Sequence, residues 1–123
     1  MDYKKKYTKE NRLKQQIKYN SLSGSKANMF QYCKNNGILH EETKFKVFQH
    51  LVRLNHTVYT EVEFKDKNRA DIVSFDEKGN GYIFEIVNSE SQESINNKLD
   101  KYDIDFELFF VYCNKPIEAQ LII

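Results

Sequence analysis

The fold is decided by residues 69–87, which read RADIVSFDEKGNGYIFEIV. The two ends of this stretch, residues 69–75 and 82–87, are rich in β-branched and aromatic residues, which favour strands. Between them, residues 76–81 contain the Asp, Gly and Asn that hairpin turns require. We therefore predict two strands joined by a tight turn. The second strand is apolar at almost every position, so we expect it to be central in a sheet and covered on both faces.

The segments on either side of this hairpin predict an α/β fold. Apolar residues recur at three- and four-residue steps after His40 and predict an amphipathic helix of about 15 residues. Residues 58–64 alternate apolar and polar side chains and predict a half-buried strand. After the hairpin, serines and early acids predict a helix that extends to Tyr102, and residues 106–112 predict a fourth strand. The order α-β-β-β-α-β implies a mixed four-stranded sheet flanked by helices, because a helix between the last two strands allows them to be parallel.

The amino-terminal residues differ in charge from the rest of the chain. Residues 1–36 carry nine Lys and Arg against two acids, a charge of +7, and the remainder carries ten against sixteen, a charge of −6. We therefore divide the chain into a basic extension, residues 1–37, partly helical or flexible, and a domain of residues 38–123. Two short helices are expected in the extension, over residues 12–19 and 26–35. Such an extension is either a solvated tail or an arm that contacts phosphates, because clustered Lys and Arg attract polyanions.

Length and composition restrict the class of protein. A chain of 123 residues is the size of one domain, and 40% apolar residues with 17 Phe and Tyr suffice for a core. No stretch approaches the roughly 20 apolar residues of a membrane span, and no signal peptide opens the chain. Cys33 and Cys113 are too few for a disulfide framework or a zinc cluster. We expect a cytoplasmic protein, in the host cytoplasm if the chain is viral, that does not bind membranes.

Three acids occupy positions that are unusual for carboxylates. Asp71 lies near the start of an apolar strand and Glu85 inside the most hydrophobic one, where burial is costly without a cation, a metal or hydrogen-bond donors. On neighbouring strands the two carboxylates converge on one divalent ion, and oxygen ligands favour Mg²⁺ or Mn²⁺. Glu41, or its neighbour Glu42, adds a third acid from the first helix. Each also has an ordinary interpretation: Asp71 as a partner of Arg69, and Glu41 as a first-turn acid stabilised by the helix dipole.

With these motifs the chain resembles the PD-(D/E)xK nuclease superfamily, which includes Holliday-junction resolvases, many restriction endonucleases, and archaeal and viral nucleases. The resemblance covers residues 38–113 and rests on the order of elements, on RADIV carrying Asp71 and on IFEIV carrying Glu85. It implies a restriction-endonuclease-like core in which Asp71 and Glu85 hold Mg²⁺ or Mn²⁺. It also implies that Glu41 belongs to the catalytic site.

One position departs from the pattern of this superfamily. The superfamily has Lys two residues after the second acid, where this chain has Val87. Some members carry that lysine on another element. Lys98 on the following helix is the first candidate for a relocated lysine, and Lys44 on the first helix is the second. Both also read as ordinary solvated lysines of helix surfaces.

The resemblance implies a metal-dependent DNA endonuclease, selective for DNA structure and a homodimer. The alternative, favoured by Val87, is a catalytically inactive nuclease-fold protein that binds nucleic acid or assembles with proteins. A third interpretation is an interaction protein whose apolar tail, residues 121–123, joins a partner or a second copy. The residues expected to contact DNA are the basic residues of the extension and of the first strand turn: Lys4, Lys5, Lys6, Lys9, Arg12, Lys14, Lys65, Lys67 and Arg69.

Overall fold

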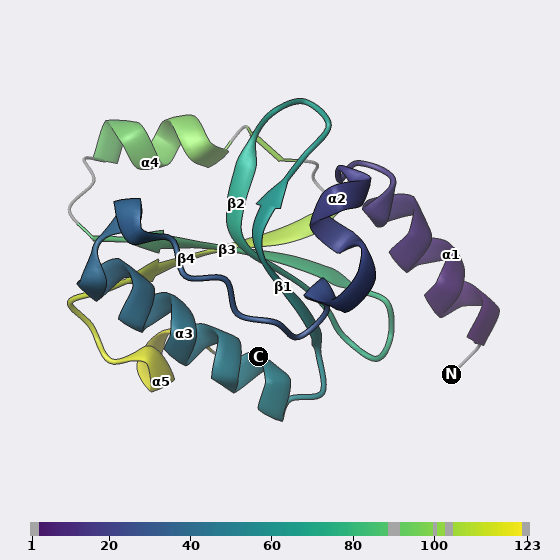
Figure 1. Ribbon diagram of the computed structural model, residues 1–123, viewed down its shortest axis with the longest axis horizontal. Helices are drawn as coiled ribbons and strands as arrows, with labels where there is room; N and C mark the ends of the chain where they lie inside the picture. Colours follow the sequence, from purple (N-terminus) through teal and green to yellow (C-terminus); the bar gives the residue numbers. More distant parts are fainter. Residues whose placement is uncertain (1–2, 89–91, 100, 103–104, 122–123) are drawn as a thin grey trace.

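A mixed four-stranded sheet organises the chain (Figure 1). The computed structural model describes residues 3–88, 92–99, 101–102 and 105–121, without the side chains of residues 3–7 and 92–94. In chain order, the elements are α1 (Tyr3–Lys14), α2 (Tyr19–Leu22), the 3₁₀ turns η1 (Gly24–Lys26) and η2 (Lys34–Asn36), α3 (Ile38–Arg53), β1 (Thr57–Glu63), β2 (Arg69–Phe75), β3 (Gly81–Val87), α4 (Gln92–Leu99), β4 (Phe106–Tyr112) and α5 (Ile117–Gln120).

The sheet has the order β1-β2-β3-β4. Its first three strands are antiparallel neighbours, whereas β4 pairs with β3 in parallel after the crossover through α4. β3 is an inner strand, and each of its residues except Tyr82 is buried, because helices cover both faces. The predicted α/β class and the mixed four-stranded sheet flanked by helices are confirmed.

Apolar side chains form a core cluster on each face of the sheet. On one face, Val47 and Leu51 of α3 pack with Phe84 of β3 and Val111 of β4. On the opposite face, Leu13 of α1 packs with apolar residues of β2 and β3. Figure 1 shows α3 and α5 on one side of the sheet and α4 on the other. The sheet therefore lies between two layers of helices.

The amino-terminal helix differs from the predicted one. It was expected over residues 12–19 but spans Tyr3–Lys14, and the chain then turns so that Ile17 forms a bridge with Phe64. This contact with the end of β1 stops the helix before the residues that were expected to extend it. Leu13 and Ile17 are both buried, so the extension packs on the sheet through these two residues.

The prediction of a second short helix in the extension, over residues 26–35, is wrong. Between η1 and η2 the chain makes a turn at residues 27–28 and then follows β1, because Asn28 and Gln31 hydrogen-bond to that strand. The side-chain oxygen of Asn28 accepts from the backbone N of Val58 at 2.8 Å, and Gln31 Nε2 donates to the backbone O of Thr60 at 2.9 Å. The segment covers the outer edge of β1, where unpaired backbone groups would otherwise be exposed.

Gly81, the first residue of β3, is where α1 contacts the sheet closely. A Cβ atom there would lie 2.7 Å from Leu13 Cδ1 and 2.8 Å from the Phe106 ring. We expect Gly81→Ala to lower the free energy of unfolding by about 1–3 kcal/mol through overpacking, measured by urea denaturation. Because Leu13 is a source of the clash, the effects of Gly81→Ala and Leu13→Val should not add in a double-mutant cycle. Strictly additive effects would contradict the packing of α1 on β3.

Part of the apolar carboxyl-terminal segment packs in the core of this chain. Leu121, expected in a tail that joins a partner, is buried in the same cluster as α3. Ile122 and Ile123 lie outside the described residues. Among the helices that the structure describes, none combines the length and the apolar character needed to cross a bilayer.

Candidate functional site

Three acids lie in one row across the sheet. In the register of β1 with β2, the pairs Thr60–Ile72 and Val62–Ala70 flank Glu61 and Asp71, which places these two acids level with each other. The register of β2 with β3 places Asp71 opposite Glu85, one position beyond the Ile72–Phe84 pair. Directly opposite residues of antiparallel strands have Cβ atoms about 5 Å apart and point to the same face. The structure therefore brings Asp71 and Glu85 together.

This row of acids opens into a cleft of about 310 Å³ between the sheet, α4 and the start of α3. Asp71 and Glu85 line the cleft from neighbouring strands. Three cationic side chains line it as well: Arg69 at the start of β2, Lys98 on α4, and Lys101 beyond α4. Glu61 of β1 lines it too, so the cleft combines three carboxyls with a group of positive charges.

Protein donors hold one oxygen of each carboxyl. Asp71 Oδ2 accepts a hydrogen bond of 2.8 Å from the backbone N of Ile86 and lies 3.4 Å from His40 Nε2. Glu85 Oε1 accepts a hydrogen bond from the Tyr102 hydroxyl. The two carboxyls also lie close enough to shift each other's pKa. Their orientation is therefore fixed by β3, by α3 and by the residue Tyr102 that follows α4.

The environment of the pair shifts the pKa values of the two acids in opposite directions. Burial and the neighbouring charge of Asp71 raise the pKa of Glu85 from 4.5 to about 7. Burial also opposes ionisation of Asp71, but hydrogen bonds from His40 and from the Ile86 backbone outweigh it and lower the pKa of Asp71. Near neutral pH, Asp71 is therefore ionised while Glu85 still binds a proton in part of the molecules. Two carboxyls in contact hold a proton in this way unless a cation replaces it.

Glu85→Gln is expected to remove a pH dependence of stability. Since folding raises the pKa of Glu85, its stabilisation is complete below its unfolded pKa of 4.5 and is lost as the pH rises through about 7. In EDTA, we expect wild type to lose on the order of 2 kcal/mol relative to Glu85→Gln between about pH 5 and about pH 8. Urea denaturation of both proteins across this range measures the difference. A difference that is constant with pH would contradict the raised pKa.

A buried lysine ties α3 to β1 beside the cleft. The Lys44 side chain is 0% exposed, and its Nζ donates to Glu41 Oε1 at 2.6 Å, to Glu61 Oε1 at 3.0 Å and to the backbone O of Gln31 at 2.8 Å. Nζ also lies 5.0 Å from the centroid of the Phe30 ring. These three acceptors use all the N–H groups of the ammonium. Lys44 therefore connects three segments of the chain and has no donor left for the cleft.

Glu61, which pairs with Lys44, has a strained backbone. Glu61 has a φ of 52° in the middle of β1, a left-handed conformation that a strand residue rarely adopts. Its carboxylate accepts hydrogen bonds from Lys44 and from Asn36 Nδ2, the latter at 3.2 Å. The ion pair with Lys44 compensates for the backbone strain, and Glu61 lines the same cleft as Asp71.

His40 connects the lysine network to the carboxyl pair. Its Nδ1 lies 2.8 Å from Glu41 Oε2, and its Nε2 lies 3.4 Å from Asp71 Oδ2. Burial lowers the pKa of His40, but hydrogen bonds to Asp71 and Glu41 outweigh it and raise the pKa above 6.5. Because both ring nitrogens face carboxylate oxygens, the geometry favours the doubly protonated ring. The ring fixes Asp71 relative to α3.

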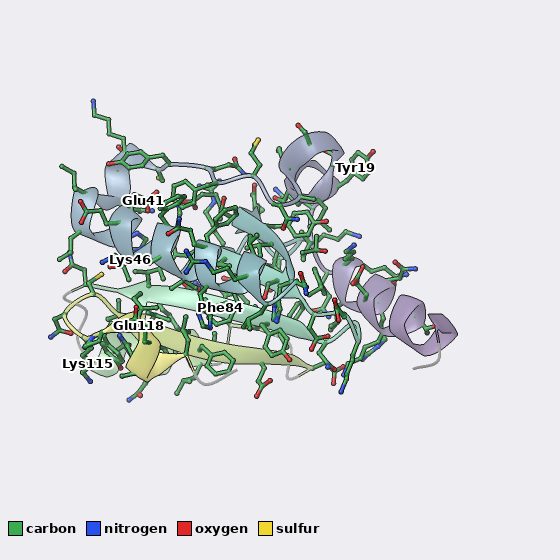
Figure 2. The ribbon with its side chains drawn as sticks, turned by 90° about the horizontal axis from the view of Figure 1, so that it is seen from below. Tyr19, Glu41, Lys46, Phe84, Lys115 and Glu118 are labelled. Carbon is green, nitrogen blue, oxygen red and sulfur yellow. The ribbon has the colours of Figure 1, made fainter. Side chains whose placement is uncertain are left out.

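The structure distinguishes between the acids and lysines proposed from the sequence. Glu41 is 1% exposed and bound by Lys44 and His40, whereas Glu42 is exposed (Figure 2). Glu41 is therefore the acid of α3 that joins the buried network beside the cleft, but it does not line the cleft itself. Burial raises the pKa of Glu41, but hydrogen bonds from Lys44, the Cys33 backbone N and His40 together outweigh it and lower the pKa. Lys98 lies in the cleft with Asp71 and Glu85, and Lys44 does not line it. Val87 is buried, at the end of β3.

Neither His40 nor Glu61 stands out in the sequence pattern. The only signal for His40 is its position next to Glu41 in the first turn of α3. Glu61 occupies a polar position of an alternating strand, where an acid is ordinary. Its relation to Asp71 depends on the register of β1 with β2, which the sequence does not specify.

The basic residues of the extension lie away from the cleft. Lys9 Nζ donates to Asn80 Oδ1 at the turn before β3, and Arg12 forms an ion pair with Asp105 just before β4. Lys14 forms an ion pair within α1. These contacts are at the end of the sheet where β3 begins, and four residues of strand, about 13 Å, separate that end from Glu85. The described basic residues of α1 therefore do not converge on the carboxyl pair.

The other basic residues expected to contact DNA fall into two groups. The side chains of Lys4, Lys5 and Lys6 are among those that the structure does not describe. Lys67 is exposed on the turn between β1 and β2, and Arg69 lines the cleft. Lys65, at the start of the same turn, is exposed as well, so Arg69 is the described residue of this set that lines the cleft.

The chemistry of the cleft fits a small, hard divalent cation. In the part of the chain that the structure describes, no three His, Cys, Asp or Glu side chains form a complete metal cage. Mg²⁺ does not require one, since it is commonly bound through one or two carboxylates together with water and substrate phosphate. Asp71 and Glu85 are two such carboxylates, and the proton that they retain is the charge that a cation would replace. The residues present therefore fit one Mg²⁺ or Mn²⁺ ion.

Comparison of the chain with protein-family models, with curated proteins and with solved structures gave no match. The cleft is therefore interpreted from its own residues.

Proposed function

We propose that this protein is a metal-dependent nuclease that hydrolyses phosphodiester bonds of DNA in the cleft between β2, β3 and α4. The observation that carries the proposal is the carboxyl pair of Asp71 and Glu85 beside Arg69 and Lys98 in one cleft. A buried acid pair suits a divalent ion, and the neighbouring cations suit the phosphate that such an ion binds.

The topology of the sheet supports the same proposal. The elements α3, β1, β2, β3, α4 and β4 follow the order α-β-β-β-α-β on which the resemblance to the PD-(D/E)xK superfamily rests. Asp71 and Glu85 occupy the second and third strands, as in that resemblance. We propose that the core is restriction-endonuclease-like on this basis.

The residues of the cleft have separate roles in the proposed reaction. Asp71 and Glu85 would hold one Mg²⁺ or Mn²⁺ ion. When bound, such an ion supplies positive charge to a phosphoryl oxygen and acidifies water. Tyr102 fixes the orientation of Glu85, and His40 fixes that of Asp71. Preorganised ligands of this kind avoid a reorganisation cost during the reaction.

Lys98 is the residue that we assign to the place of the missing superfamily lysine. It lies in the cleft from α4, whereas Lys44 is fully buried and has all three donors engaged. An ammonium beside the phosphate stabilises the charge that develops on it during hydrolysis. Lys44 instead acts as a positioning residue, through its ion pairs with Glu41 and Glu61.

One observation favours a second function. Val87 is buried at the position where the superfamily carries its lysine. If Lys98 does not replace that lysine, the chain is a nuclease-fold protein that binds nucleic acid without cutting it. Binding and cleavage therefore need to be measured separately.

The test incubates the full chain with supercoiled, linear and branched DNA in Mg²⁺, in Mn²⁺ or in EDTA. We expect strand cleavage with either ion and none in EDTA, and weaker cleavage by Lys98→Met. Lys46→Met is the matched control, because Lys46 is an exposed lysine on the outer side of α3 (Figure 2). Binding of DNA without cleavage in any ion would support the second function and overturn the first.

A further inference from the structure

We propose that a single strand of nucleic acid follows a track from the cleft, past the turn between β1 and β2, to Tyr19 on α2. This inference rests on the proposed function for the identity of the polymer, and it adds the path that the strand takes. The track is defined by three adjoining hollows and their lining residues.

Each hollow shares a lining residue with the next, so the three adjoin one another in a row. The cleft of the carboxyl pair, of about 310 Å³, shares Lys101 with a hollow of about 220 Å³ beside the turn between β1 and β2. That hollow shares Lys65 with a third, of about 430 Å³, bordered by α1 and α2. Figure 1 shows this turn between α4 and α2, which places it midway along the path.

Positive charge follows the track. Arg69 and Lys98 line its beginning, Lys101 and Lys65 its two junctions, and Lys14 its far end. In the described residues, Lys65 takes part in no ion pair. A row of cations along a groove binds a phosphate backbone of any sequence, since each contact releases condensed counterions.

The acids beside the turn between β1 and β2 are already engaged. Both carboxylate oxygens of Asp66 accept hydrogen bonds from Asn68, at 3.0 and 3.1 Å. Glu63, at the end of β1, forms an ion pair of 2.7 Å with Lys18. These contacts reduce the repulsion that a polyanion in the groove would otherwise meet.

At the far end of the track, the exposed aromatic ring of Tyr19 favours nucleic acid over an acidic peptide as the occupant. Its side chain is 80% exposed and projects outward from α2, at the end of the molecule remote from Glu41 (Figure 2). It borders the third hollow together with Lys14 and Lys65. An exposed aromatic ring among lysines is the arrangement on which unpaired bases stack. A flexible single strand can follow a path that passes a hairpin turn, whereas duplex DNA is stiff over this length.

The experiment measures binding of a fluorescein-labelled oligothymidylate by fluorescence anisotropy, with the full chain in EDTA. We expect Tyr19→Ala to weaken binding about tenfold and Tyr19→Phe to leave it within about twofold, because stacking requires the ring and not the hydroxyl. Lys65→Glu should weaken binding about fivefold or more and reduce the salt dependence. Lys46→Glu on α3 is the matched charge reversal outside the track and should match wild type.

The outcomes separate this inference from the proposed function. Wild-type affinity of both Tyr19→Ala and Lys65→Glu would overturn the track, whether or not the wild type cuts DNA in Mg²⁺. Binding of polyglutamate as tightly as the oligonucleotide, unchanged in Tyr19→Ala, would also overturn it and indicate an acidic protein as the occupant. Binding that depends on both residues supports the track, even if no cleavage occurs in any ion.

Discussion

Asp71→Asn is expected to reduce metal-dependent cleavage of DNA by about a thousandfold or more while the chain remains folded. The substitution keeps the shape of the side chain and its acceptor for the Ile86 backbone N, but it removes the charge that would hold the ion. A bound metal contributes several kcal/mol of transition-state stabilisation, and each 1.36 kcal/mol is a factor of ten in rate. The measurement is the initial rate of cleavage in Mg²⁺, with circular dichroism to confirm folding.

The control for Asp71→Asn is Glu42→Gln, which removes the charge of an exposed acid on α3. We expect this variant to cleave at the wild-type rate. Glu85→Gln should behave like Asp71→Asn, because the two carboxyls would hold the same ion. Cleavage that persists in both Asp71→Asn and Glu85→Gln would place the nuclease activity elsewhere and sink the proposed site.

Lys44→Met is expected to lower the free energy of unfolding by about 3–5 kcal/mol, the usual cost of removing one partner from a buried ion pair. Lys44 is fully buried, and its loss leaves the Glu61 carboxylate without its cation and the Glu41 carboxylate with His40 alone. The strained backbone of Glu61 loses its compensating contact at the same time. Urea denaturation measures the effect, and Lys46→Met on the exposed side of α3 should change stability by less than about 0.5 kcal/mol.

A triple variant separates the charge effect of Lys44 from its packing. Lys44→Met combined with Glu41→Gln and Glu61→Gln leaves no uncompensated charge, so we expect it to recover part of the stability lost in Lys44→Met. If Lys44→Met were as stable as Lys46→Met, the buried network would not be a source of stability. If the triple variant were the least stable of all, packing rather than charge would explain the loss.

Much of the sheet was predictable because its signals are local. Arg69–Phe75 and Phe106–Tyr112 begin and end as predicted, since runs of β-branched and aromatic residues end at turn residues there. The approach of Asp71 to Glu85 was also predictable, because a tight hairpin places the strands side by side. An acid inside an apolar strand is a signal that a single sequence carries without any alignment.

The remainder of the structure depends on contacts between distant segments. Residues 28–31 lie along β1 because of hydrogen bonds with Val58 and Thr60, about 30 positions away, and helix propensity cannot predict such bonds. The role of Glu61 depends on strand register and on an unusual φ. His40 joins Glu41 to Asp71 only because α3 is placed next to β2. Such three-dimensional relations determine the site more than any sequence motif does.

The most direct test of the metal site is Mn²⁺ binding, measured by electron paramagnetic resonance of the free ion. At about pH 8, above the pKa of Glu85, we predict one ion bound per wild-type chain and at least about tenfold weaker binding by Asp71→Asn and Glu85→Gln. Affinity should fall as the pH drops below about 7, because a proton on Glu85 then competes with the ion. Absence of Mn²⁺ binding by wild type at that pH, or equal binding by all three proteins, would contradict a metal site at Asp71 and Glu85.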